Sequence, residues 1–283
     1  MTPSPNDVLD LFVVIDPTQE LQPALTHALR ISESARARIQ LFVCIFDQAA
    51  ESGPVDTRTA AREHMIDRNR QWLESLAQPL TDRGTTVTTR IEWDANWREA
   101  IVRAAREERP DLLIKATFKH SATARTLFKT SDRLLLRHCG CPVLLVKSAQ
   151  LWTSNKILGC LEPKPGDVGH AELNEAVMHA TRALADRLGA GAHFVLACDD
   201  SEDMPDARDL AQVAAVPRAQ IHLCVDNPVD AIISTARRLD VGLLVIGTIA
   251  RRGASALVIG NTAEKVLDRV DIDVLAVPIP EKS

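Results

Sequence analysis

The residues from Gly247 to Asn261, GTIARRGASALVIGN, have the types and spacing that could hold a phosphate. They follow the apolar run DVGLLVIG and precede TAEKVLDRV, which has the pattern of a helix. Glycine lets the backbone approach an anion closely and adopt positive φ. The first amides of a helix lack partners within the helix and favour negative charge. The stretch therefore predicts an anion site where a strand leads into a helix.

A plain turn followed by a capped helix is the alternative for the same residues. Asn261 and Glu264 have the spacing of a helix N-cap with its reciprocal acid. Ala250 adds a methyl group where a bound phosphate would need bare backbone. Arg251 and Arg252 could contact phosphate or could simply be solvated. Both interpretations stay open on the sequence alone.

The composition narrows the class of protein. A formal net charge of -5 over 283 residues argues against a general nucleic-acid binder. The N-terminal residues show no basic and apolar leader pattern, and the apolar runs are too short for a membrane span, so we expect a cytoplasmic protein. Six scattered cysteines favour a reducing compartment over a disulfide framework. The HCGC stretch at 138–141 lacks a second ligand pair at zinc spacing, so we expect no metal.

An internal repeat organises the chain. NWREAIVRAAREERPDLLIKAT (96–117) aligns without a gap with NPVDAIISTARRLDVGLLVIGT (227–248), 131 positions later. The same offset relates CPVLLVK (141–147) to IDVLAVP (272–278). Similarity at a fixed offset indicates a duplicated structural unit. We predict two domains, 1–148 and 156–283, connected by the linker SAQLWTSN.

Each copy alternates short β-branched runs with helical stretches. Near-continuous apolar strands separated by helices predict an α/β fold with a parallel sheet covered on both faces. Between the second and third strands of the second copy, the helix is expected to be shortened or lost. The expected strands are 11–16, 39–46, 87–93, 111–117 and 142–147 in the first copy, and 156–161, 193–199, 220–226, 242–248 and 273–278 in the second.

A five-stranded α/β repeat that ends in Gly-x-x-Gly, nine residues and Gly-Ser/Thr resembles the universal stress protein family. VVIDP near the start and GNTAE near the end make the chain similar to the E-type tandem members. The resemblance covers nearly the whole chain except the shortened segment around 200–217. It implies two tandem five-stranded parallel-sheet domains with strand order 3-2-1-4-5, the adenine nucleotide alpha hydrolase-like fold. It also implies a pseudo-dimer in which strands 142–147 and 273–278 meet.

The resemblance further implies a small-molecule ligand, with a nucleotide such as ATP the first candidate. Gly247 and Gly260 match the family's first and third glycines, whereas Ala250 and Asn261 depart from its pattern. The family's aspartate at the end of the first strand falls on Glu162. The implied ligand-binding set is Gly247, Thr248, Ala250, Arg251, Gly253, Gly260, Asn261, Thr262 and Glu162.

The first copy lacks these glycines. Ala116, Lys119 and Lys129 stand in the columns of Gly247, Ala250 and Gly260, so the first site is degenerate or binds an anion through side chains. Lys115 lies inside an apolar strand, where an unpaired charge is costly. Asp16 is its expected partner, in direct or one-water contact. This first-domain polar centre, Asp16 and Lys115, is either a structural ion pair or a ligand-sensing centre.

The residue patterns contain no familiar catalytic set, such as a GxxxxGK[ST] loop, an HExxH helix or a GxSxG elbow. We therefore expect a non-enzymatic stress-response protein that binds a ligand, with nucleotide bound weakly and only by the second copy. A slow nucleotide hydrolase and a carrier of an apolar or lipid-like ligand stay open as alternatives. No direct contact with nucleic acid is expected, and a further homodimer stays open.

Overall fold

The computed structural model describes residues 8–33, 36–52, 54–117, 132–163, 168–250, 257–258 and 260–279. The chain divides into two compact units, 1–116 and 117–283. The last strand of the first sequence copy therefore lies in the second unit. The copy boundaries at 148 and 156 stay a prediction about the repeat.

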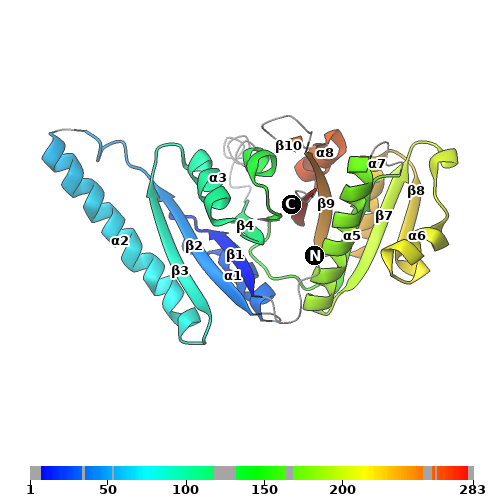
Figure 1. Ribbon diagram of the computed structural model, residues 1–283, viewed down its shortest axis with the longest axis horizontal. Helices are drawn as coiled ribbons and strands as arrows, with labels where there is room; N and C mark the ends of the chain where they lie inside the picture. Colours follow the sequence, from blue (N-terminus) through cyan, green and yellow to red (C-terminus); the bar gives the residue numbers. More distant parts are fainter. Residues whose placement is uncertain are drawn as a thin grey trace. The chain divides into compact units, whose positions relative to one another are not determined.

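The first unit alternates parallel strands with helices. Its elements are β1 (Leu9–Val14), α1 (Pro23–Ser32), β2 (Ala37–Ile45), α2 (Val55–Thr81), β3 (Thr86–Trp93), α3 (Trp97–Glu108) and β4 (Leu112–Ala116). The strand order β3-β2-β1-β4 matches the predicted 3-2-1-4. Because crossovers between parallel strands are right-handed, α1 and α2 cover one face and α3 the other. Figure 1 shows α2 and α3 on opposite sides of β3.

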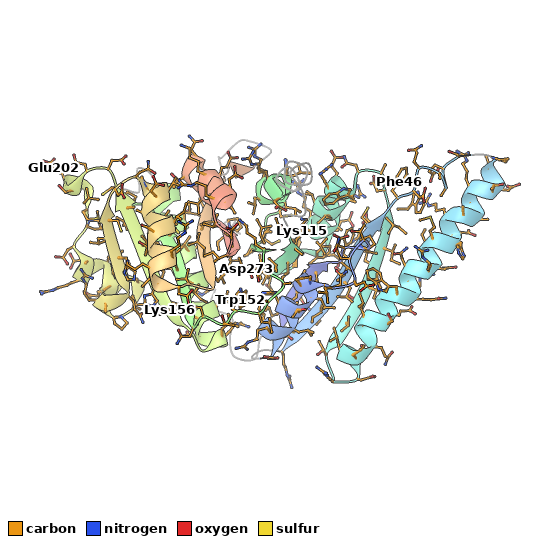
Figure 2. All side chains as sticks on the ribbon, turned by 180° about the vertical axis from the view of Figure 1, so that it is seen from behind. Phe46, Lys115, Trp152, Lys156, Glu202 and Asp273 are labelled. Carbon is orange, nitrogen blue, oxygen red and sulfur yellow. The ribbon has the colours of Figure 1, made fainter. Side chains whose placement is uncertain are left out.

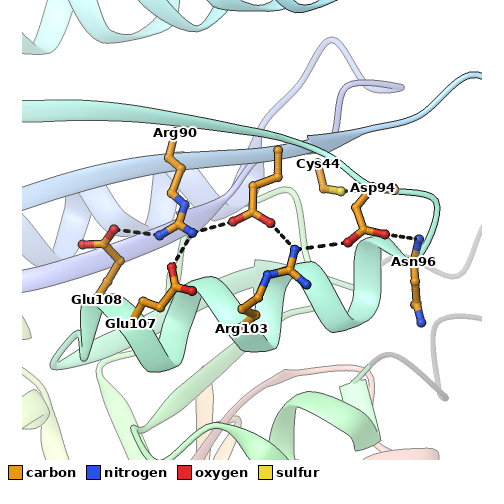
Figure 3. Close-up of polar contacts among 8 residues, drawn as sticks. Cys44, Arg90, Asp94, Asn96, Arg103, Glu107 and Glu108 are labelled. Atoms are coloured by element: carbon orange, nitrogen blue, oxygen red, sulfur yellow. Dashed lines mark hydrogen bonds and ion pairs between the residues drawn. The ribbon is translucent and has the colours of Figure 1, made fainter. Parts of the chain in front are cut away.

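An ion-pair network ties strand β3 to helix α3 (Figure 3). Its members are Arg90, Glu92, Asp94, Arg103, Glu107 and Glu108. Arg90 contacts three of the carboxylates, and Arg103 contacts two. Exposed single pairs contribute little, but a connected network holds strand and helix in one register. The network therefore fixes α3 against the outer strand of this sheet.

The second unit repeats the alternation and adds the last strand of the first copy. Residues 132–138 are helical and precede β5 (Val143–Val146). The other elements are β6 (Lys156–Leu161), α5 (Val168–Leu188), β7 (Gly191–Cys198), η1 (Ser201–Asp203), α6 (Ala207–Ala214), η2 (Arg218–Gln220), β8 (Ile221–Val225), α7 (Pro228–Leu239), β9 (Leu243–Ala250), β10 (Leu257–Val258), α8 (Asn261–Arg269) and β11 (Asp273–Pro278). The order β8-β7-β6-β9-β11 is the predicted 3-2-1-4-5.

Two helices of this unit pack on opposite faces of its sheet. A Cβ atom at Gly159 of β6 would lie 2.7 Å from Thr181 Oγ1, so this side of the strand faces α5. The thiol of Cys224 on β8 instead lies 3.8 Å from the hydroxyl of Thr235, which belongs to α7. The helix between β7 and β8, α6, has 8 residues, whereas α2 at the matching place in the first copy has 27. The predicted shortening is confirmed.

Strands β5 and β11 pair antiparallel, with Leu144 opposite Leu275. This is the contact between 142–147 and 273–278 that the sequence predicts. Asp273, 1% exposed at the start of β11, holds the chain that leaves β5. Its carboxylate accepts the backbone N–H groups of Lys147 (2.7 Å) and Ser148 (3.2 Å) and the indole N–H of Trp152 (2.7 Å). Figure 2 labels Trp152 and Asp273, which lie beside each other.

Helices α3 and α7 end in the same unusual way. Arg109 caps α3 with φ 49°, and Asp240 caps α7 with φ 53°. The left-handed conformation costs a residue with a Cβ atom roughly 1–2 kcal/mol, which is why glycine is usual there. The two residues are 131 positions apart, the offset of the repeat. Both copies therefore carry the same backbone conformation with unrelated side chains.

Asp273→Asn should lower the free energy of unfolding by about 1–3 kcal/mol, because the new amide N–H₂ would face an N–H donor at a buried site. Urea denaturation followed by fluorescence measures the loss. Trp152→Phe removes only the indole donor and should cost less. Equal stability of Asp273→Asn and the wild type would show that these hydrogen bonds do not hold the segment.

Arg109→Gly and Asp240→Gly should each raise the free energy of unfolding by about 0.5–1 kcal/mol. The relief of the left-handed conformation exceeds the entropy that glycine adds to the unfolded chain. Thermal unfolding of each variant beside Arg106→Gly, which lies within α3 and should destabilise, provides the comparison. A loss of stability in both cap variants would contradict the assigned strain.

Candidate functional site

The start of helix α8 offers free backbone donors. Gly260 is the N-cap, with φ −61° and ψ 149°, and no side chain caps the helix. The amides of Asn261, Thr262 and Ala263 have no acceptor in the described part of the chain, and the Glu264 amide bonds to the Gly260 carbonyl at 2.9 Å. A Cβ atom at Gly260 would meet no described heavy atom within 4 Å. Three such amides next to a glycine can donate hydrogen bonds to an anion.

The predicted cap is placed differently. Asn261 is exposed and is the first residue of α8, so it does not cap the helix. The carboxylate of Glu264 reaches away from the helix start and pairs with Arg137 at 3.1 Å. The expected N-cap with its reciprocal acid is therefore wrong, because Glu264 takes a charged partner outside α8. The amides that this cap would have satisfied find no acceptor among the residues that the structure describes.

Gly247 has a packing role. A Cβ atom there would lie 2.5 to 2.7 Å from three carbons of the Leu173 side chain on α5, closer than packed atoms can approach. Leu173 is itself 4% exposed, so its side chain is packed inside the protein. The absence of a side chain at Gly247 is thus explained by the approach of α5 to β9. Gly247 does not need a ligand to account for it.

The residues that follow Gly247 continue the strand. The Thr248 side chain is 2% exposed, and its hydroxyl donates to the Val277 carbonyl of β11 at 3.3 Å. Ala250 pairs with Leu257 in the antiparallel ladder between β9 and β10. The described residues here form a short antiparallel ladder, where the sequence alone suggests an open loop. Arg251 and Gly253, two further predicted ligand residues, lie outside the described residues.

Glu162 follows β6 at the carboxyl edge of the second sheet, as predicted. A carboxamide on α5 holds its backbone: the Glu162 amide donates to Asn174 Oδ1 at 2.9 Å, and Asn174 Nδ2 donates to the Glu162 carbonyl at 3.0 Å. The Glu162 side chain is exposed. Its carboxylate is therefore the part of this residue that can meet a ligand at the sheet edge.

The first unit has the same kind of clamp at Asp16. Its amide donates to Gln22 Oε1 at 3.0 Å, and Gln22 Nε2 donates to the Asp16 carbonyl at 2.8 Å. Sequence reasoning missed both clamps, because the carboxamide lies six residues after Asp16 and twelve after Glu162. The signal is a carboxamide near the first helix of each copy, and an alignment at a fixed offset does not detect it.

Asp16 and Lys115 form no direct ion pair. The Asp16 carboxylate accepts the backbone N–H and the hydroxyl of Thr18, at 2.9 and 2.6 Å. The Lys115 side chain is 4% exposed, donates to the Ala116 carbonyl at 3.0 Å, and lies 5.9 Å from the centre of the Trp97 ring (Figure 2). No direct contact forms between them, because a local turn satisfies the aspartate and an aromatic face receives the ammonium group, and the one-water contact stays a prediction.

The thiols near these strand ends are poor nucleophiles. Burial, and then the charge of Glu162, raise the pKa of Cys160 far above its ordinary value. Burial raises the pKa of Cys44 in β2 to about 11. Only a thiolate attacks or binds metal efficiently, so both groups are inert at neutral pH. Within the described ranges no group of three or more His, Cys, Asp or Glu side chains could hold a metal, and no described helix is long and apolar enough to cross a membrane.

Comparisons with known proteins point to one family. Residues 10–147 and 170–278 match the model of the universal stress protein family. The chain is 27% identical to universal stress protein E of Escherichia coli (strain K12) over 294 residues, which covers 95% of this chain and 93% of that protein. It is 23% identical to a universal stress protein E homolog of Haemophilus influenzae, over 96% of this chain and 98% of that one.

Solved structures agree with the observed fold. A functionally unknown protein from Pseudomonas aeruginosa PAO1 superposes with a TM-score of 0.76 at 28% identity, covering 98% of this chain and 95% of that chain. A universal stress protein from Archaeoglobus fulgidus superposes with a TM-score of 0.69 over 97% of both chains. At 14% identity, the second likeness concerns the fold alone. The tandem α/β architecture predicted from the repeat is confirmed.

Gly247→Ala should lower the free energy of unfolding by about 1–3 kcal/mol in the absence of any ligand, because the new methyl group overlaps Leu173. In a double-mutant cycle with Leu173→Ala, the double variant should lose less stability than the sum of the two single losses, since alanine at position 173 makes room for the new methyl group. Chemical denaturation of all four proteins measures the coupling. Additive losses would show that Gly247 and Leu173 are not coupled, and a ligand-binding role would then be the better explanation of the glycine.

Proposed function

Because the chain belongs to the universal stress protein family, we propose that it is a cytoplasmic stress-response protein that binds a nucleotide at the carboxyl edge of its second sheet. Family membership supports the stress-response role. The observation that carries the nucleotide proposal is the start of α8, where three amides without an acceptor among the described residues follow Gly260. These groups would hold the terminal phosphates, as helix N-termini hold anions elsewhere.

The proposed site suits the phosphate end of a nucleotide better than its nucleoside end. The amides of Asn261 and Thr262 suit phosphate oxygens, and the carboxylate of Glu162 can accept hydrogen bonds from ribose hydroxyls or an exocyclic amine. At Gly247, by contrast, the Leu173 side chain of α5 occupies the space beside the backbone, so this glycine offers no room for a phosphate. Helix α6 has only 8 residues and offers little cover beyond β7. We therefore propose weak binding, on the order of micromolar, near −8 kcal/mol.

We place the protein among ligand-binding proteins and not among hydrolases. The described side chains at the start of α8 are those of Asn261, Thr262 and Ala263, and these residue types do not act as general bases at neutral pH. The thiol of Cys160, in the neighbouring strand β6, is protonated at neutral pH. Binding and release of the nucleotide would then be the signal, with no chemical step required.

Gly260→Val should weaken the binding of a fluorescent ATP analogue at least about tenfold, since a branched side chain would cover the amides that hold the phosphates. The backbone of Gly260 is extended, a conformation valine accepts, so the variant should fold normally. Titration followed by fluorescence anisotropy measures the affinity. Gly140→Val, at another glycine with no described atom near its Cβ position, is the matched control and should bind like the wild type.

Binding that survives Gly260→Val would place the nucleotide elsewhere, and no binding at millimolar analogue would leave this region as a turn and a helix start. Mass spectrometry of material extracted from the purified protein separates the alternatives. Retained ATP supports the proposal. Retained ADP that accumulates from added ATP points to hydrolysis, and retained lipid points to an apolar carrier.

A further inference from the structure

Two histidines contact each other at the amino edge of the second sheet. His193 of β7 and His222 of β8 are joined by a hydrogen bond of 3.1 Å between Nδ1 and Nε2. Their rings lie 5.4 Å apart at 19°, close to parallel. They share the face of the sheet that α7 covers, because His222 lies two residues before Cys224, which meets Thr235 of α7. This edge is opposite the one proposed to hold a nucleotide.

Three cations lie on the segments next to the pair and act on its charge. Lys156, at the start of β6, donates to the Leu239 carbonyl at 3.0 Å, which holds its ammonium group at the last turn of α7 (Figure 2). Arg218 donates to the Ile221 carbonyl at 3.0 Å, immediately before His222. Arg238 belongs to the last turn of α7. None of the three forms an ion pair within the part of the chain that the structure describes.

The positive surroundings act on both rings. Burial, and then Lys156, lower the pKa of His193. Burial, followed by His193, Arg238 and Arg218, lowers the pKa of His222 to about 4. Asp240, the exposed C-cap of α7, is a nearby carboxylate in sequence and forms no ion pair among the described residues. Both imidazoles are therefore neutral at pH 7, and no carboxylate among the described residues pairs with the cations next to them.

Helix termini explain only part of this arrangement. Cations at the end of α7 are favourable because the helix dipole is negative there, which accounts for Lys156 and Arg238. It does not account for Arg218, which precedes β8, or for two histidines placed side by side. A protein with net charge -5 has carboxylates to spare, and many of its arginines elsewhere are paired with them. The five basic residues form no such pair within the described ranges.

We propose that Lys156, His193, Arg218, His222 and Arg238 form a binding site for a small phosphate-class anion, separate from the nucleotide site. Lysine and arginine supply fixed positive charge and N–H donors, and guanidinium groups match phosphate oxygens in geometry. The histidine pair supplies a variable charge. Its hydrogen bond persists when the pair has a net charge of zero or one, because one ring N–H can still donate to the lone pair of the other ring.

Anion binding and proton uptake are linked at this site. A bound phosphate offsets the cations that disfavour the imidazolium form, so it raises the pKa of both histidines toward their ordinary value. By reciprocity, the anion binds more tightly as the pH falls from 7 toward 5. The site would thus respond to acidification together with the concentration of the anion.

Titration of the full chain with inorganic pyrophosphate, followed by NMR of the histidine ring signals, tests the proposal. We expect saturable shifts of the His193 and His222 signals, a higher pKa for His222 in the bound form, and tighter binding at pH 5.5 than at pH 7. Arg238→Gln should weaken binding roughly tenfold. The matched control is Arg237→Gln in the same turn of α7, which should bind nearly as well as the wild type.

The Gly260→Val background separates this site from the nucleotide site, because pyrophosphate bound at α8 is lost there while the histidine response remains. Vesicles with anionic headgroups, added in place of pyrophosphate, should give no stronger response than the free anion. The proposal is overturned if pyrophosphate shifts neither ring at several millimolar. It is equally overturned if affinity is independent of pH, or if Arg238→Gln and Arg237→Gln weaken binding alike.

Discussion

The antiparallel contact between β5 and β11 is the constraint on which the second unit depends. All of Val143–Val146 and all of Asp273–Pro278 are buried, so neither strand could remain an exposed edge. β11 lies between β5 and β9, and its position fixes the strand whose end leads toward α8. Asp273 adds a buried carboxylate on which three N–H groups converge, and these hydrogen bonds offset the cost of burying it. The pairing of β5 with β11 therefore stabilises both the fold of the second unit and the position of the candidate site.

The two matched glycines of the family pattern serve different physical needs here. Gly247 gives α5 room to approach β9, whereas Gly260 leaves the start of α8 uncovered. A glycine selected for packing and one selected for ligand access look the same in a sequence. The distinction appears only when the atoms around each missing Cβ are known. Under the proposed function, the phosphates would therefore be held at the start of α8 alone, and that is why we propose weak binding.

The strands and the shortened α6 could be predicted from apolar periodicity and the repeat, whereas the strand order and the meeting of the last strands were implied by the family resemblance. Prediction from the sequence failed where side chains choose between nearby partners. Asp16 bonds to Thr18 and Lys115 lies over Trp97, a choice of a few ångströms that residue types do not encode. Glu264 likewise pairs with Arg137, 127 positions away. Long-range partners such as these decide which predicted caps and ion pairs form.

The left-handed caps of α3 and α7 bear on how this chain arose. Arg109 and Asp240 share neither size nor charge, yet their backbone angles differ by only a few degrees. The simplest explanation is that the single unit already turned this way before it was duplicated. Each descendant then exchanged the side chain while the path of the main chain was inherited. The backbone conformation at this position is thus the same in both copies although the side chains differ.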